Sequence, residues 1–125
     1  MNLKIFLLII ISVTFSALAQ IVLKFGMTSD KIQHVLDNKL NRLEVFLTII
    51  GNTHVIGGLA IYGIGALLWL LVLSRLDVSQ AYPFVGMGFI LTMLFAFIFL
   101  GEPMKAARIL GTLLVTAGVI LISRS

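Results

Sequence analysis

The sequence predicts an all-α integral membrane protein with four transmembrane helices and an amphipathic helix between the first two. Three observations lead to this prediction. Hydrophobic residues make up 60% of the chain and charged residues 11%, whereas soluble domains carry about 25% charged residues. Four long stretches are apolar and almost free of charge, and one connection repeats apolar residues at helical spacing. We expect one membrane domain, 1–125, because the four spans account for most of its length.

The expected spans cover about 3–24, 55–73, 78–101 and 104–123. The third has 24 residues without charge between Asp77 and Glu102. As a helix these would measure about 36 Å, against a hydrocarbon core of about 30 Å. The first span is similar to a signal peptide, but its apolar run continues to Lys24, so we expect it to be retained.

The connection 29–50 has the pattern of an amphipathic helix. Apolar residues recur every three or four positions from Ile32 to Ile50, and polar or charged residues fill the other face. Ser29 is suited to cap the start of this helix, and Gly51 is suited to end it. We expect the helix to lie in the membrane interface.

A stripe of polar residues runs along the first span. Ser12, Ser16, Gln20 and Lys24 recur every four positions and so share one face of a helix. Such residues can join two helices by hydrogen bonds, or they can line a polar cavity. We favour a helix contact for Ser12 and a cavity for Ser16 and Gln20.

The third span carries an expected hinge, which consists of Pro83, Gly86 and Gly88. Proline lacks an amide donor and disfavours helical dihedral angles at the preceding residue, Tyr82. Irregular backbone inside a membrane persists only where protein buries it or water reaches it. The hinge could therefore face a transport pathway, or the proline could simply improve helix packing; both interpretations stay open.

Small residues line one face of the fourth span. Ala107, Gly111 and Gly118 permit close approach of another helix, so we expect them to pack between two subunits.

The sequence lacks the residues that several classes of function require. The chain has no nucleophile–base pairing, phosphate loop or cysteine, and His34 and His54 are too far apart in sequence to suggest a metal site. No basic patch is interleaved with aromatic residues, which argues against nucleic-acid binding. We therefore expect no enzymatic activity, cofactor or metal. No ionisable residue falls in the middle of a span, so the polar lining should consist of hydroxyl and amide groups, with cationic and aromatic residues near the ends, rather than an ion-coupling site.

Four short motifs occur in order along the spans. They are LKFG at 23–26, LWLL at 68–71, AYP at 81–83, and the pair Gly111 and Gly118. In this order the chain resembles the small multidrug resistance family and its relatives in the drug/metabolite transporter superfamily. The run at 68–84, LWLLVLSRLDVSQAYPF, is most similar to the flippase subunits for aminoarabinose-phosphoundecaprenol.

The resemblance has consequences for the site. It implies a role for Trp69 and Tyr82, which match the family pattern. The multidrug branch has an essential Glu where this chain has Ser16, and a Trp where it has Val85. The resemblance therefore implies the same scaffold without the drug-and-proton site. It also implies movement of a lipid-linked sugar across the bacterial inner membrane by a homodimer, or by a heterodimer with a related subunit.

We predict a transporter or flippase for an amphiphilic substrate, foremost a polyprenyl-phosphate-linked sugar. The alternatives are a small multidrug exporter of cationic or neutral compounds and a non-transporting accessory subunit of a lipid-glycosylation system. Lys24 or Arg75 would meet the phosphate near the interface. The expected substrate-binding residues are Ser16, Gln20, Lys24, Trp69, Arg75 and Tyr82.

The basic residues predict an orientation. Three of them, Lys4, Arg75 and Arg124, fall on one side of the expected membrane, and six fall on the other: Lys24, Lys31, Lys39, Arg42, Lys105 and Arg108. The positive-inside rule places the second group, with the 29–50 connection, in the cytoplasm and both termini outside.

Overall fold

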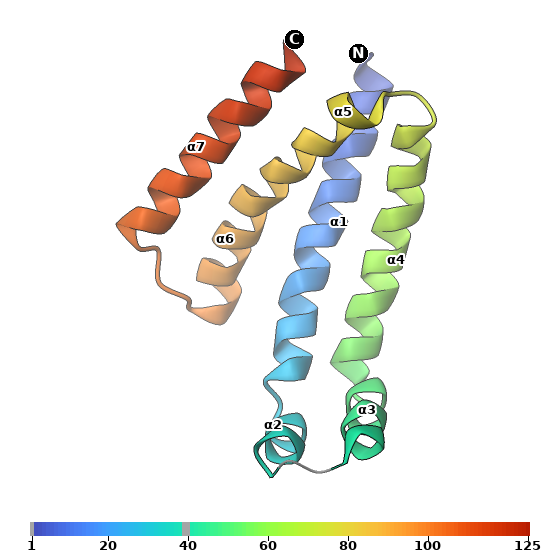
Figure 1. Cartoon of the computed structure of the whole chain (residues 1–125), viewed down its shortest axis with the longest axis vertical. Coiled ribbons are helices and arrows are strands. Elements are labelled where there is room, and N and C mark those ends of the chain that lie inside the picture. Colours follow the sequence, from blue (N-terminus) through green and yellow to red (C-terminus); the bar gives the residue numbers. More distant parts are fainter. Residues whose placement is uncertain (1, 39–40) are drawn as a thin grey trace.

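The computed structural model describes residues 2–38 and 41–125, and within these ranges the chain forms helices and short connections without strands (Figure 1). Lys39, one of the basic residues counted above, lies outside the described residues. The elements are α1 (Leu3–Met27), α2 (Asp30–Asp37), α3 (Arg42–Ile50), α4 (Thr53–Leu73), α5 (Val78–Ala81), the 3₁₀ helix η1 (Tyr82–Val85), α6 (Gly86–Leu100) and α7 (Ala106–Ser123).

Four helical segments are long and apolar enough to cross a membrane, which confirms the predicted four-span fold. They are Leu3–Met27, Thr53–Leu73, Val78–Leu100 and Ala106–Ser123. The third comprises α5, η1 and α6 in succession. With four such segments, the chain is a multi-pass membrane protein.

Helices α1 and α4 lie antiparallel and in contact along most of their length (Figure 1). Glycine makes this approach possible: a Cβ atom on Gly58 would lie 2.7 Å from Leu23 Cγ and 3.1 Å from its backbone nitrogen. At Gly65 the carbonyl accepts a hydrogen bond of 2.7 Å from the hydroxyl of Ser12, which is 4% exposed. This bond confirms that Ser12 joins two helices.

The far end of this pair is held by Asn52. Its side-chain oxygen accepts from Val55 N at 3.1 Å and caps α4, while its amide nitrogen donates to Ser29 Oγ at 3.3 Å. A Cβ atom on Gly26 would lie 2.8 Å from Asn52 Oδ1. The absence of a side chain at Gly26 therefore lets the start of α4 close against the end of α1.

The expectation of one continuous helix over 29–50 is wrong, because the segment contains two helices. The Asn38 side chain donates to His34 O at 2.9 Å at the end of α2. Asn41 then caps α3 by accepting from Glu44 N at 2.8 Å. Asparagine side chains compete with helical backbone hydrogen bonds and favour helix ends, which explains the interruption.

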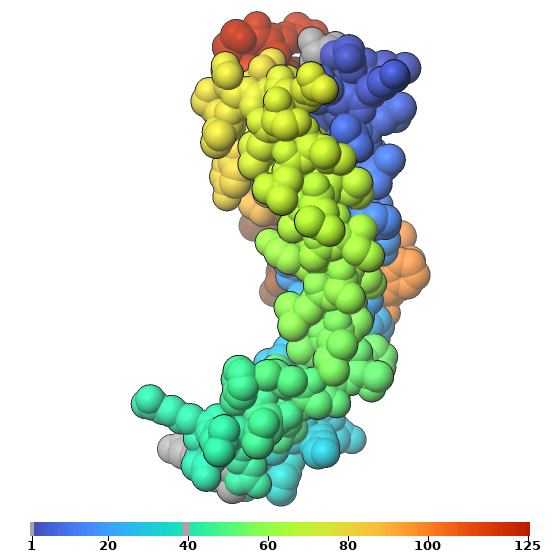
Figure 2. Space-filling view, turned by 90° about the vertical axis from the view of Figure 1, so that its right-hand side faces the viewer, coloured from blue at the N-terminus to red at the C-terminus, as the bar shows by residue number. Residues whose placement is uncertain are grey.

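The two short helices differ in burial. Helix α2 buries Ile32 and Val35, whereas α3 has no buried residue and exposes Leu43, Phe46 and Leu47. Both run across the end of the α1–α4 pair rather than along it, and this end projects sideways in Figure 2. The direction fits a location in the membrane interface, which stays a prediction.

The irregular start of the third span takes the form of a 3₁₀ turn over Tyr82–Val85. The expectation that Pro83 would move Tyr82 out of the helical region is wrong, since its φ is −60° and its ψ −37°. The chain adapts by tightening one turn, as 3₁₀ geometry allows, and not by leaving helical dihedral angles.

The two glycines of the expected hinge occupy close contacts. A Cβ atom on Gly86 would lie 2.8 Å from Val119 Cγ2, and one on Gly88 would lie 3.3 Å from Val13 Cγ1. These distances support the packing interpretation, because the missing side chains admit α7 and α1. The role of Pro83, Gly86 and Gly88 as a hinge stays a prediction.

The hydrophobic core lies at the end of the molecule where α5 and η1 cross α1 and α4. Helices α6 and α7 diverge from α1 and α4 beyond this point (Figure 1). Val119 is the buried residue of α7. The core residues are Ile9, Val13, Val72, Ala81, Phe84 and Val119. One end of the bundle is therefore closed, while the α6–α7 side stays open.

The α1–α4 contact can be tested with adjacent glycines. Gly58→Ala should lower the free energy of unfolding by about 1–3 kcal/mol, because the new methyl group would collide with Leu23. Gly57→Ala is the matched control, since its Cβ would meet no atom within 4 Å. It should be neutral or stabilising by up to about 1 kcal/mol through helix propensity. Thermal unfolding in detergent measures both, and equal stability of the two variants would contradict the described contact.

Candidate functional site: a cavity between four helices

A cavity of about 900 Å³ lies between α1, α4, α6 and α7. Its lining combines small, aromatic and polar residues. The polar ones are Ser12, Ser16, Gln20, Thr92, Glu102, Arg108 and Thr112, and the aromatic ones are Tyr62, Trp69, Tyr82 and Phe89. The closed α1–α4 pair provides one side, and the diverging helices provide the other.

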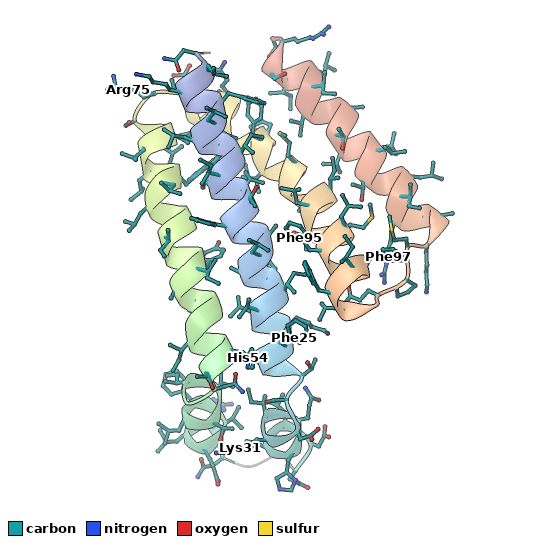
Figure 3. All side chains as sticks on the ribbon, turned by 180° about the vertical axis from the view of Figure 1, so that it is seen from behind. Phe25, Lys31, His54, Arg75, Phe95 and Phe97 are labelled. Atoms are coloured by element: carbon teal, nitrogen blue, oxygen red, sulfur yellow. The ribbon has the colours of Figure 1, made fainter. Side chains whose placement is uncertain are left out.

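Four of the six predicted substrate-binding residues line this cavity: Ser16, Gln20, Trp69 and Tyr82. Lys24 and Arg75 are not part of the lining. Arg75 lies in the connection that follows α4, at the closed end of the bundle (Figure 3). The structure therefore brings together the hydroxyl, amide and aromatic residues, but not the two cations expected to meet a phosphate.

Helix geometry explains why the polar stripe leaves the cavity before Lys24. A step of four residues turns about 40° beyond a full rotation at 3.6 residues per turn. Three such steps separate Ser12 from Lys24, so the stripe rotates by about 120° over its length. Ser12, Ser16 and Gln20 stay on the lining, and Lys24 does not.

Two aromatic lining residues, Tyr62 and Phe89, were not predicted. Tyr62 precedes Trp69 by seven positions, and Phe89 follows Tyr82 by seven. Seven residues are close to two helical turns, so each pair shares one face of its segment. The seven-residue spacing from Trp69 and Tyr82 could therefore have predicted Tyr62 and Phe89. Tyr82 is 64% exposed and Phe89 56% exposed, so their rings remain accessible within the chain.

Two charged residues that were not among the predicted site residues also line the cavity. Glu102 and Arg108 lie at the end of the cavity formed by the α6–α7 connection, and we call these two residues the charged end. A cation near the end of the lining agrees with the expectation, although Lys24 or Arg75 and not Arg108 was expected there, whereas a carboxylate on the lining was not expected.

The backbone of the connection places the charged end. Gly101 ends α6 with a φ of 67°, and Glu102 N donates back to Ala96 O at 3.2 Å. A left-handed glycine directly after the last helical residue is a common helix stop. Arg108 Nη1 donates to Pro103 O at 3.1 Å, which holds the guanidinium beside the connection.

The residues predicted for subunit packing also lie on the open side. Ala107 and Gly111 line the cavity, and a Cβ atom added to Gly111 or Gly118 would meet nothing within 4 Å. The chain by itself does not close the cavity, since lining residues such as Gln20 and Arg108 are exposed. Within residues 2–38 and 41–125, no group of three or more acidic or histidine side chains could hold a metal ion.

Comparison with known families identifies the scaffold. The model of the EamA-like transporter family matches residues 35–124, which include α4, α6 and α7. The chain belongs to the EamA-like transporter family. This match confirms the predicted relation to the drug/metabolite transporter superfamily, and it assigns three of the four cavity helices to the family domain.

Individual relatives extend the comparison. The chain is 43% identical over 63 residues to the probable 4-amino-4-deoxy-L-arabinose-phosphoundecaprenol flippase subunit ArnE of Pseudomonas aeruginosa (strain UCBPP-PA14), which covers 50% of this chain and 55% of the relative. Its counterpart in Pseudomonas syringae pv. syringae (strain B728a) is 44% identical over 66 residues, covering 53% and 61%. The uncharacterized protein y4nH of Sinorhizobium fredii (strain NBRC 101917 / NGR234) is 34% identical over 110 residues, covering 87% and 86%.

The match therefore spans about half the length of these flippase subunits. No solved structure matches the chain.

The cavity can be tested by cysteine labelling, because the chain contains no cysteine of its own. Gln20→Cys and Thr112→Cys, both on the lining, should react in a membrane with a charged maleimide, since water in the cavity permits the reactive thiolate to form. Leu67→Cys is the control: Leu67 is 65% exposed but lies outside the cavity, so lipid should protect it. We expect its rate to be at least about tenfold lower. Equal labelling of all three positions would contradict a water-accessible cavity.

Proposed function

We propose that this protein is a flippase subunit that moves an amphiphilic substrate, foremost a polyprenyl-phosphate-linked sugar, across the bacterial inner membrane. The observation that carries the proposal is the cavity of about 900 Å³, with a polar lining and an open side, within four membrane-spanning segments. The names of the ArnE relatives, which describe them as probable aminoarabinose-phosphoundecaprenol flippase subunits, support the same substrate class.

The open side of the cavity suits a substrate with two unlike parts. A headgroup loses its hydrogen bonds to water when it enters the membrane, and an unsatisfied polar group costs several kcal/mol there, about 2–7 by transfer measurements. Ser16, Gln20 and Thr92 offer donors and acceptors that replace this water. The apolar tail would remain in the bilayer beyond the open side.

The aromatic lining supports the same substrate class. Trp69 and Tyr82 combine an apolar ring with a polar atom, so they can contact both the faces and the hydroxyl groups of a sugar. Both line the cavity beside the polar residues of α1. Arg108 takes the role first expected for Lys24 or Arg75, because it is a cation on the lining and can meet a phosphate by charge-assisted hydrogen bonds.

An exporter of small cations is the second candidate, and Glu102 on the cavity lining is the observation that favours it. Proton-coupled export needs an ionisable group at membrane depth that binds either a proton or the cation. Ser16 occupies the position that resembles that of the essential Glu of the multidrug branch, and a serine cannot do this. Glu102 lies instead at one end of the cavity, on the α6–α7 connection.

A transport assay separates the two candidates. Purified protein in vesicles, alone or with a related subunit, should move a fluorescent polyprenyl-phosphate-linked sugar between leaflets. Tyr82→Ala should slow this movement by about tenfold, the effect of losing roughly 1.4 kcal/mol of substrate interaction. Leu67→Ala, outside the cavity, is the control and should leave the rate unchanged. Proton-driven uptake of a quaternary ammonium dye without lipid movement would support the exporter instead.

We further propose that a second copy or a related subunit packs against α7 and completes the cavity. Gly111→Leu tests this: open space surrounds the position in a single chain, so the substitution should leave the fold intact while its bulk weakens association. Ala60→Leu, an exposed small residue of α4 outside the cavity, provides the matched control. Crosslinking in membranes measures association, and a dimer unchanged by Gly111→Leu would exclude this part of α7 as the interface.

A further inference from the structure

The cavity is chemically different at its two ends. The lining near η1 consists of aromatic and small residues, while the end near the α6–α7 connection carries Glu102 and Arg108. Among the described residues, these two are the charged members of the lining. The asymmetry gives a bound molecule a preferred direction, since a charged group on it would seek the charged end.

The backbone holds Glu102 at this end. Gly101 has a left-handed φ of 67°, a conformation that other residues adopt only with strain. The return bond from Glu102 N to Ala96 O closes the last turn of α6 and directs the chain across the end of the cavity. Glu102 is partly buried there, and the return bond determines the position of its backbone.

Arg108 is held from the other side of the connection. It lies in the first turn of α7, and its Nη1 donates to Pro103 O at 3.1 Å. A guanidinium carries five N–H donors, so this bond leaves several available. They form a planar fork that matches the oxygens of a phosphate, which a lysine cannot reproduce.

Two opposite charges on a cavity lining make a selective site. Burying a charge is costly unless it is paired, and Glu102 is partly buried on this lining. A headgroup with both a phosphate and a protonated amine can satisfy both residues. A headgroup with a phosphate but no amine would satisfy Arg108 and leave Glu102 without a partner, and such an unpaired charge is a source of discrimination.

We infer that Glu102 and Arg108 recognise a zwitterionic headgroup, with Arg108 on its phosphate and Glu102 on its amine. This inference rests on the proposed function and assigns specificity within the same cavity. Glu102 and Arg108 contribute binding selectivity, and the hydroxyl and aromatic residues line the rest of the cavity.

The test uses the single tryptophan of the chain, Trp69, which lines the cavity and reports its occupancy by fluorescence. The full chain, in micelles of an uncharged maltoside detergent, is titrated with lysophosphatidylethanolamine and with lysophosphatidylglycerol of the same acyl chain. The first probe is zwitterionic and the second anionic. The native protein should bind the zwitterionic probe about tenfold more tightly, as one charge-assisted hydrogen bond predicts.

Two substitutions assign the roles. Glu102→Gln should remove this preference by weakening the zwitterionic probe alone, about tenfold, whereas Arg108→Gln should weaken both probes by about tenfold. Asp77→Asn and Lys105→Gln are matched controls, because they remove the same charges outside the cavity lining. Glu102→Asp and Arg108→Lys keep the charge and test the site if the neutral variants do not fold; both should bind, with Arg108→Lys weaker toward phosphate.

The outcomes separate this inference from the proposed function. If both probes change Trp69 fluorescence equally and neither substitution matters, the cavity binds amphiphiles but the charged end does not select them, which overturns the inference alone. If Glu102→Gln and Arg108→Gln instead lower thermal stability equally without changing binding, the two residues form a structural ion pair, and the inference is again overturned. If neither probe changes the fluorescence, the proposed function fails together with the inference.

Discussion

The close contact between α1 and α4 is the constraint on which the rest of the structure depends. Lipid tails are as apolar as leucine, so helices associate in a membrane through packing and hydrogen bonds rather than through the hydrophobic effect. Gly58 admits Leu23, and the hydroxyl of Ser12 donates to the carbonyl of Gly65. Because α1 and α4 pack closely against each other, the cavity lies between this pair and the diverging helices α6 and α7.

Glycine residues have different surroundings on different helices. Gly86 and Gly88 admit the valine side chains of α7 and α1 at the closed end of the bundle. Gly111 has open space around it and lines the cavity. A glycine in this family scaffold can therefore close a contact within one chain or leave room for a substrate or a second subunit, and its surroundings decide between them.

Much of the site could be predicted from spacing along single helices. The four-residue repeat identified Ser16 and Gln20, and the resemblance to the transporter family pointed to Trp69 and Tyr82; all four lie on the cavity lining. Lys24 extends the repeat but rotates out of the cavity, because four residues exceed one helical turn. Glu102 and Arg108 could not be assigned in this way, since Glu102 belongs to the α6–α7 connection and Arg108 to the first turn of α7, and the direction of both depends on the backbone dihedral angles of the connection.

By itself, the sequence determined the four spans and the class of membrane protein, because a hydrocarbon layer requires long apolar helices whatever surrounds them. It also determined the family, through short motifs in a fixed order. Only the tertiary structure decided that 29–50 divides into two helices and that the charged end faces the cavity. The first depends on the Asn38 side chain, which competes for a backbone carbonyl at the end of α2. The second depends on the left-handed dihedral angles of Gly101 and on which helices lie opposite. Hydropathy is a sum along the chain, whereas the direction of a side chain is a property of the folded arrangement.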